Sequence, residues 1–237
     1  MKQIKVSIIT PCLNSSETIE RTIKSVLQQT YSNIEYIIID GKSTDNTINI
    51  IRQYLPKFEG RMRFISEKDS GIYNAMNKGI KLSTGQLIGI INSDDFYEKD
   101  TVEKVVLCSS REKYQVIYGY CRIIDNNHIT GIIKRNHKGL GKEMIPHPTC
   151  FITKKTYKDF GLFLTLYKIT GDYELMLRLF YSGKVKFIQV KEILANFTLG
   201  GISSNKRCSI ETTLIQYFYH YISFTTMIKK IARLYLK

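Results

Sequence analysis

Hydrophobic positions in the first half of the chain follow two alternating patterns. Short apolar runs, typical of buried strands, occur at residues 5–10, 34–39, 62–66 and 86–91. Between these runs, apolar residues recur at helical spacing at residues 16–29, 45–54 and 70–82. Pro56 is expected to end the second of these helices. Strands and helices that alternate over short connections predict an α/β fold with a mostly parallel, Rossmann-like sheet and helices on both faces.

The second half of the chain has a less regular pattern. Residues 116–124 and 128–134 have the pattern of two strands, and Asp125-Asn126-Asn127 between them is typical of a hairpin turn. A loop rich in Gly, His and Pro follows. Beyond it the pattern predicts a helix at residues 171–182, strands at residues 185–190 and 193–198, a flexible joint at Gly200-Gly201 and a mostly helical remainder.

Polar residues stand at the carboxyl ends of three predicted strands, namely Thr10, Asp40 and Asp94. Ligands of open α/β sheets bind beyond these ends. Asp94 is followed by Asp95, and two adjacent carboxylates repel each other unless a cation lies beside them. Mg²⁺ or Mn²⁺ held by one or two carboxylates commonly bridges substrate phosphates, so the pair indicates a metal–diphosphate site. Alternatively, one of the two residues caps a helix near residues 99–107.

Composition limits the classes of protein to consider. The chain has 237 residues, of which 43% are hydrophobic, and this is enough for one large domain or two small ones. Its apolar runs are too short to span a bilayer, and its N-terminus lacks a signal-peptide pattern. The five scattered cysteines argue against a disulfide framework or a structural zinc. We therefore expect a cytoplasmic protein with reduced thiols.

The formal net charge of +14 fits nucleic acid, an anionic membrane or phosphorylated substrates as partners. Neither GxxxxGK[ST] nor GxGxxG occurs in the sequence, so neither a P-loop enzyme nor an ordinary dinucleotide enzyme is indicated. No helix-turn-helix, RRM-like or zinc-finger pattern accompanies the charge, so a basic nucleic-acid-binding domain is the weaker alternative.

Four ordered blocks within residues 4–205 resemble the family 2 inverting glycosyltransferases, which have the GT-A fold. Residues 6–47 resemble the opening of that family, with an Asn-containing turn, a helix ending in SVLQQTY, and DGKSTDNT. The other three blocks are SEKDSGIYNAMNKGIKLSTGQLIGIINSDDFY, PHPTCFITKK and TGDYELMLRL. The resemblance implies a nucleotide-binding half at residues 1–98, an acceptor-binding half at residues 99–205, and a separate C-terminal tail at residues 206–237.

The resemblance also implies a site for a UDP-sugar, built from Thr10, Pro11, Asn14, Asp40, Asp69 and Asp94. Thr10 and Pro11 would line the uridine pocket, Asp40 would accept a hydrogen bond from the uracil ring, and Asp69 would lie near the base. Asp94 would contact the ribose or the metal, and Asp95 would bind Mn²⁺ or Mg²⁺. Many relatives have a further acid where this chain has Asn92.

Asp172 matches the catalytic base of the family. A base must remove the proton of the acceptor hydroxyl as the new bond forms, and one base without an enzyme nucleophile implies inversion. Many relatives have Glu where this chain has Gly171. Glu174 is an alternative base, but it lies about 200° around the helix from Asp172, so both cannot face one cleft. Asp172 could instead cap the helix.

Two loops have both a functional and a plain structural interpretation. His147 matches a family position near the acceptor or the diphosphate, or it is simply a loop histidine between two prolines. Residues 200–203 resemble a loop that closes over the donor in relatives, and a Gly pair can act as a hinge, but they could equally form an ordinary turn.

The C-terminal region is basic and amphipathic. Residues 214–237 contain no Asp or Glu. One predicted helical face carries Phe224, Met227, Ile228, Ile231, Leu234 and Tyr235, and the opposite face carries Lys229, Lys230, Arg233 and Lys237. This pattern suits the surface of an anionic membrane. The alternatives are a helix packed on the domain and a contact in a homodimer.

These observations together predict a metal-dependent inverting glycosyltransferase. The resemblance implies transfer from a UDP-sugar to a growing, lipid-diphosphate-linked bacterial surface glycan (O-antigen, capsule or exopolysaccharide) at the cytoplasmic face of the membrane. A catalytically retired GT-A scaffold is a further alternative, since Asn92 and Gly171 replace acids of the family.

Overall fold

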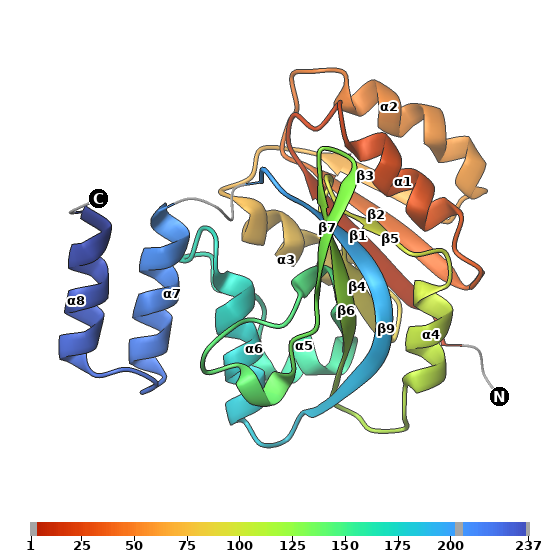
Figure 1. The fold of residues 1–237 in the computed structure, drawn as a ribbon. Coiled ribbons are helices and arrows are strands. Elements are labelled where there is room, and N and C mark those ends of the chain that lie inside the picture. Colours follow the sequence, from red (N-terminus) through yellow and green to blue (C-terminus); the bar gives the residue numbers. More distant parts are fainter. Residues whose placement is uncertain (1–3, 202–205, 236–237) are drawn as a thin grey trace.

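The computed structural model describes residues 4–201 and 206–235, and a nine-stranded sheet forms its centre (Figure 1). Half of this sheet is parallel, in the order β3-β2-β1-β4. The bounds of these strands are Met62–Ser66, Ile34–Asp40, Val6–Cys12 and Leu87–Ile90, respectively. The four strands agree with the four apolar runs of the first half, so this part of the prediction is confirmed.

Antiparallel pairings extend the sheet beyond β4. A three-residue strand, β8 (Phe151–Thr153), joins β4 to β6 (Gln115–Asp125), and β6 pairs in parallel with β9 (Lys186–Thr198). The short strand β5 (Phe96–Tyr97) pairs with β9, and β7 (His128–Ile133) forms the predicted hairpin with β6.

Helices cover both faces of the sheet, as predicted (Figure 1). On one face lie α1 (Ile19–Leu27), α2 (Thr47–Tyr54) and α4 (Thr101–Cys108). On the other face lie α3 (Ile72–Leu82), α5 (Lys154–Phe160) and α6 (Gly171–Tyr181). Side chains of a strand alternate between faces, so Ile8 of β1 packs with the first group of helices and Ile9 packs with the second.

The second helix ends at Tyr54, as predicted, and Pro56 lies in a 3₁₀ turn (Leu55–Phe58) that follows it. Two other details of the sequence interpretation were wrong. Residues 186–198 form one strand rather than two, because the exposed polar pair Lys191-Glu192 lies where the β6–β9 register shifts and the strand continues beyond it. The first helix begins at Ile19, three residues later than expected.

Two C-terminal helices, α7 (Lys206–Phe218) and α8 (Phe224–Tyr235), form a hairpin beside α6, on the left of Figure 1. Ile215 of α7 is fully buried and belongs to the same hydrophobic cluster as α3 and α6. Helix α8 packs on α7 and buries Met227. The predicted boundary at residue 205 therefore separates two segments that share a core. None of the helices in residues 4–201 and 206–235 is long and apolar enough to cross a membrane.

Candidate active site

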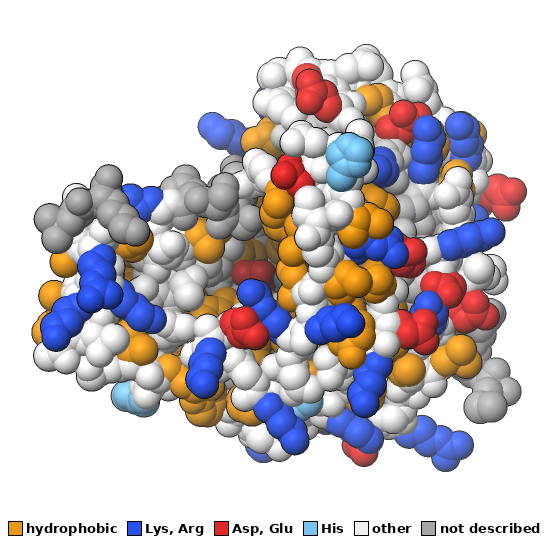
Figure 2. Space-filling view, viewed as in Figure 1, with side chains coloured by type: hydrophobic (Ala, Val, Ile, Leu, Met, Phe, Trp, Pro, Cys, Tyr) orange, Lys and Arg blue, Asp and Glu red, His pale blue; other side chains and the backbone are white. Residues whose placement is uncertain are grey.

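A cleft of about 1110 Å³ lies at the carboxyl ends of the parallel strands. Figure 2 shows the molecule hollowed between the α7–α8 hairpin and the sheet. Six of the nine predicted site residues line this cleft, namely Pro11, Asn14, Asp69, Asp94, His147 and Asp172. The other three, Thr10, Asp40 and Asp95, are fully buried and are not among the described residues that line it. Both halves of the sequence thus contribute to one cavity.

The buried pair Thr10 and Asp40 supports the floor of the cleft. Asp40 accepts hydrogen bonds from the backbone N–H groups of Lys42 and Ser43, at 3.1 Å each, and from the Ser66 hydroxyl at 2.6 Å. The Thr10 hydroxyl accepts a hydrogen bond from Tyr36 at 2.9 Å. These bonds fix the turn after β2, whose Gly41 lines the cleft. The contact of Asp40 with a uracil ring stays a prediction.

The two cleft residues nearest this turn are held by polar contacts. Asn14 adopts a left-handed backbone conformation with φ of 49°, which asparagine tolerates, and its side-chain oxygen accepts a hydrogen bond from the Thr44 N–H at 2.9 Å. Asp69 forms an ion pair with Lys78, at 2.6 Å, and Lys78 also pairs with Glu67. The positive charge of Lys78 therefore compensates the negative charge of the Asp69 carboxylate at the cleft.

The acid pair at the end of β4 lies at the cleft and does not cap a helix. The N-cap of α4 is Asp100, so the cap interpretation of Asp94 and Asp95 was wrong. Asp94 lines the cleft, while Asp95 is fully buried and accepts a hydrogen bond at 2.9 Å from the N–H of Thr198 in β9. Burial raises the pKa of Asp94, and burial together with the charge of Asp94 raises the pKa of Asp95 well above its usual range.

The residues around this pair fit a divalent cation. Asp95 Oδ2 and Asn92 Oδ1 are buried and accept no hydrogen bond of ordinary geometry from the described residues. The described residues contain no cluster of three or more His, Cys, Asp or Glu side chains that could hold a metal ion. Mg²⁺ and Mn²⁺ at nucleotide sites need fewer, because water and phosphate oxygens complete their coordination. Asp94, Asp95 and Asn92 offer that partial set of oxygen ligands.

Asp172 lies in the first turn of α6 and faces the cleft. Its Oδ1 accepts a hydrogen bond of 2.9 Å from the Tyr73 hydroxyl of α3. The N-cap of α6 is Thr170, so the cap interpretation of Asp172 was wrong. Glu174, the alternative base, is buried in an ion pair with Arg178 at 3.0 Å and is not among the described residues of the cleft.

Gly171 explains how Tyr73 reaches Asp172. A Cβ atom at position 171 would lie 2.9 Å from Cε2 of the Tyr73 ring, which is too close for any larger residue without a shift of that ring. Gly171 thus leaves the space that the Tyr73 ring occupies, and the Tyr73 hydroxyl bonds to Asp172.

His147 lies in a 3₁₀ turn, His147–Thr149, on the wall of the cleft. Its ring packs edge-on against Phe163, with 5.9 Å between ring centroids. Burial lowers the pKa of His147, although the negative charge of Asp172 acts in the opposite direction. The imidazole is therefore neutral at pH 7 and can serve as a hydrogen-bonding group rather than as a cation.

The loop after β9 is described only in part. Gly201 lines the cleft, and a Cβ atom there would lie 3.2 Å from Asp94 Oδ2. Ile202 and Ser203, which complete the predicted closing loop, lie outside the described residues. Lys237 of the predicted basic face lies outside them as well.

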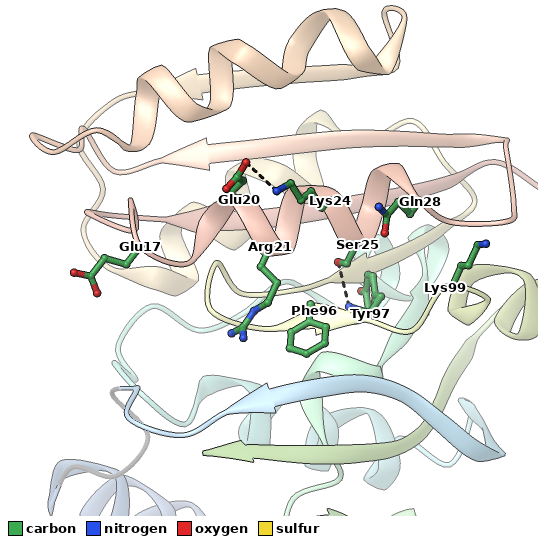
Figure 3. A pocket seen from close by; sticks show the side chains of 9 residues that line it. All are labelled: Glu17, Glu20, Arg21, Lys24, Ser25, Gln28, Phe96, Tyr97 and Lys99. Carbon is green, nitrogen blue, oxygen red and sulfur yellow. Dashed lines mark hydrogen bonds and ion pairs between the residues drawn. The ribbon is translucent and has the colours of Figure 1, made fainter. Parts of the chain in front are cut away.

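A second, smaller pocket of about 440 Å³ lies between α1 and β5 (Figure 3). Three of its charged groups already have partners, since Glu20 pairs with Lys24 at 3.0 Å and Arg21 stacks over the Phe96 ring. Arg21 also donates a hydrogen bond to the Asp94 carbonyl at 2.9 Å. Arg21 of this pocket thus holds the backbone of the acid pair. The larger cleft is the candidate active site.

Comparison with known proteins agrees with this geometry. Residues 7–167, more than half of the chain, match the family model described as "Glycosyl transferase family 2". The chain belongs to this glycosyltransferase family. Asp172 lies just beyond the matched residues, so the family match does not cover it.

Related glycosyltransferases are found among bacterial proteins. A "PGL/p-HBAD biosynthesis glycosyltransferase" of Mycobacterium tuberculosis is 27% identical over 201 residues, which cover 84% of this chain and 78% of that protein. Chondroitin synthase of Escherichia coli is 43% identical over 98 residues, which cover 41% of this chain and 14% of that protein.

Solved structures show that the chain has the GT-A fold of other glycosyltransferases. S. aureus TarS 1–349 in complex with UDP-GlcNAc has a TM-score of 0.73 and 16% identity, over 98% of this chain and 71% of that chain. The chain spans 43% of the longer TarS structure. The mannosyltransferase PcManGT of Pyrobaculum calidifontis, in complex with GDP-Man and Mn²⁺, has a TM-score of 0.69 over all of this chain and 71% of that chain, at 16% identity.

Several residues of this glycosyltransferase's cleft escaped the sequence interpretation. Tyr73 occupies an ordinary apolar position of a predicted helix, so nothing in the pattern marked it as a partner of Asp172. Cys208 and Thr212 of α7 line the cleft, although α7 was assigned to a separate tail. Nothing in the sequence marked α7 as a wall of the cleft, because the burial of its acid, Glu211, is known only from the structure.

Proposed function

We propose that this family 2 glycosyltransferase transfers a sugar from a UDP-sugar with inversion, using Asp172 as the base. One observation carries the proposal: Asp94, at the end of β4, and Asp172, at the start of α6, line the same cleft. The nucleotide-sugar complexes of TarS and PcManGT support a nucleotide-sugar donor, and those of TarS favour uridine.

The protein's own residues supply base chemistry in this reaction. Asp172 accepts the proton of the acceptor hydroxyl, whose oxygen then forms a bond to the anomeric carbon while the bond from that carbon to the diphosphate breaks. The electron pair of the broken bond leaves with UDP, and the configuration at carbon inverts. Tyr73 orients the carboxylate of Asp172 through its hydroxyl.

The charge of the cleft favours a divalent cation for donor binding. Its lining residues include six carboxylates, contributed by Glu17, Asp45, Asp69, Asp94, Glu143 and Asp172. Glu143 is paired with Arg135 at 2.9 Å, and Asp69 is paired with Lys78 at 2.6 Å. Among the described lining residues, four carboxylates therefore remain against one cation, Lys142. A diphosphate entering this cleft needs added positive charge. Mn²⁺ or Mg²⁺ held by Asp94 and Asp95 would neutralise the charge that grows on the leaving diphosphate.

A panel of nucleotide sugars tests the donor class. With Mn²⁺ present, we expect the full-length protein to release UDP from at least one UDP-hexose or UDP-N-acetylhexosamine and to leave GDP-mannose intact. Nucleotide release, followed by chromatography, measures this directly. Turnover of GDP-mannose alone would overturn the uridine assignment. No turnover of any sugar, with UDP still bound, would favour the retired scaffold.

The proposed acceptor is a lipid-diphosphate-linked glycan at the cytoplasmic face of the membrane. The supporting feature is α8, which exposes Phe224, Ile228 and Tyr235 by 58%, 48% and 69% and carries exposed Lys229 and Arg233 beside them. Residues 214–237 contain no acid. Exposed apolar groups flanked by cations suit an anionic lipid surface better than a neutral protein partner.

Vesicle binding tests this surface. We expect the protein to bind vesicles of phosphatidylglycerol and phosphatidylcholine, and Ile228→Glu to weaken the binding about tenfold, since it removes apolar burial and adds a repelled charge. Leu107→Glu is the matched control, because Leu107 is 77% exposed on α4. Co-sedimentation measures both variants. Equal vesicle binding by the two variants would contradict the membrane assignment. So would a parent protein that binds no vesicles and forms a dimer at higher concentration.

A further inference from the structure

A buried carboxylate of α7 holds the segment that leads into the catalytic helix. Glu211 is only 7% exposed, and three consecutive backbone N–H groups donate hydrogen bonds to its side chain. Their distances are 3.0 Å from Lys168, 2.9 Å from Ile169 and 3.1 Å from Thr170. The Thr170 hydroxyl adds a fourth bond at 3.2 Å. Glu211 and this segment lie about forty residues apart in sequence, so the contact is purely tertiary.

Glu211 places a negative charge at the start of α6. Thr170 is the N-cap of α6, and within the described residues its side chain makes no capping bond to the helix. The positive end of a helix dipole favours an anion. The Glu211 carboxylate supplies this anion from another helix, and it binds the N–H of the N-cap residue and of the two residues before it.

The carboxylate itself is fixed and stays ionised. Arg207, one turn earlier in α7, donates to Glu211 Oε1 at 2.8 Å. Burial raises the pKa of Glu211, but hydrogen bonds from Arg207 and from the backbone at residues 168–170 outweigh it, and the net pKa is lowered. The support is therefore charged at every pH at which the protein is expected to work.

Asp172 follows this segment directly. It lies two residues after Thr170, inside the first turn of α6, so a shift of residues 168–170 moves its carboxylate. Its other anchor is the Tyr73 hydroxyl at 2.9 Å. Cys208 and Thr212, on either side of Glu211 in α7, line the same cleft. Helix α7 is thus both a wall of the cleft and the support of its base.

We propose that Glu211 is a positioning residue for Asp172, and that α7 is consequently part of the catalytic unit rather than of a separate tail. The inference rests on the proposed role of Asp172 as the base. A displacement of about 1 Å in a reacting group can lower turnover roughly 100-fold, so a support of this kind has a measurable effect.

Glu211→Gln tests the proposal, because it keeps the size of the side chain but removes its charge and leaves one acceptor oxygen where two now receive the N–H groups and Arg207. We expect UDP release at saturating donor to fall about 10- to 100-fold while UDP affinity stays within about twofold. Tyr219→Phe is the matched control. It removes a hydrogen bond of 3.1 Å between the end of α7 and Glu174 of α6, away from residues 168–170. This variant should keep parental turnover.

A double variant separates positioning from general stability. If Glu211 acts through the base, Glu211→Gln should lower turnover no further when Asp172 is already Asn, whereas a structural role would add its own loss. Additive losses, or parental turnover of Glu211→Gln, would overturn the inference. Full turnover of Asp172→Asn would instead overturn the base assignment.

Amide hydrogen exchange gives a readout that needs no turnover. Exchange at residues 168–170 should speed up at least about tenfold in Glu211→Gln and stay parental in Tyr219→Phe, because only the first variant replaces the charged acceptor of their N–H groups with a neutral amide. Unchanged exchange in Glu211→Gln would show that Glu211 does not hold the segment, whatever the activity.

Discussion

Replacing Asp172 with Asn is expected to lower sugar transfer by about 10²- to 10⁴-fold, the range that general-base catalysis supplies. An amide cannot accept the proton of the acceptor hydroxyl. Its oxygen can still accept the Tyr73 hydrogen bond, which is 2.9 Å long in the parent, so the geometry of the cleft is kept. UDP affinity should therefore change by less than about twofold. Nucleotide release at saturating donor and titration of UDP measure the two effects separately.

Asp159→Asn is a suitable control for this variant. Asp159 also accepts a hydrogen bond from a tyrosine, Tyr114 at 2.7 Å, but it is not among the described residues that line the cleft. The two variants thus make the same chemical change in the same kind of contact. A loss of transfer in both would indicate a general effect of the substitution. Parental transfer by Asp172→Asn would remove Asp172 from the mechanism and leave the cleft without its proposed base.

Removal of the divalent cation is expected to weaken UDP binding at least about tenfold, because the carboxylates of the cleft otherwise face the diphosphate directly. Asp94→Asn should weaken Mn²⁺-dependent UDP binding to a similar degree. Isothermal titration of UDP with Mn²⁺, and then with EDTA, measures the effect. UDP affinity that is the same in both conditions would rule out a metal that bridges protein and diphosphate.

The Mn²⁺-dependent binding of UDP should also depend on pH. Burial raises the pKa of Asp94, and burial together with the charge of Asp94 raises the pKa of Asp95 further, so protons compete with the cation above the usual titration range of carboxylates. Metal binding requires the deprotonated groups, and Mn²⁺-dependent UDP affinity should fall as the pH is lowered from about 8 to about 5. Titrations in buffers of different ionisation enthalpy should show proton release on binding.

Glu143→Gln is the control for the metal site. Glu143 also lines the cleft, but it pairs with Arg135 at 2.9 Å. The variant removes one negative charge from the cleft without touching Asp94 or Asp95. If it reduced the Mn²⁺ dependence as much as Asp94→Asn does, a general charge effect and not a metal site would explain the binding.

Periodic hydrophobic patterns were sufficient for the parallel half of the fold. The four apolar runs became β1 to β4, and helical spacing located α1 to α3, because both signals repeat over enough residues to be recognised. The strands β5 and β8 contain two and three residues, and such segments carry no period. They form because β9 and β4 offer partners for their backbone groups, which the local sequence does not record.

The sequence by itself determined the GT-A fold class, the acid pair at the end of a strand, and the region of Asp172. These features are local, or repeat at a fixed spacing. Only the tertiary structure decided that Asp95 is buried behind Asp94, that Gly171 lets Tyr73 reach Asp172, and that Glu211 caps the segment before α6. Each of these facts depends on two segments far apart in the chain that meet in one place. The physical reason is that hydrogen bonding and burial act between such segments, whereas a sequence pattern reports only what neighbours along the chain share.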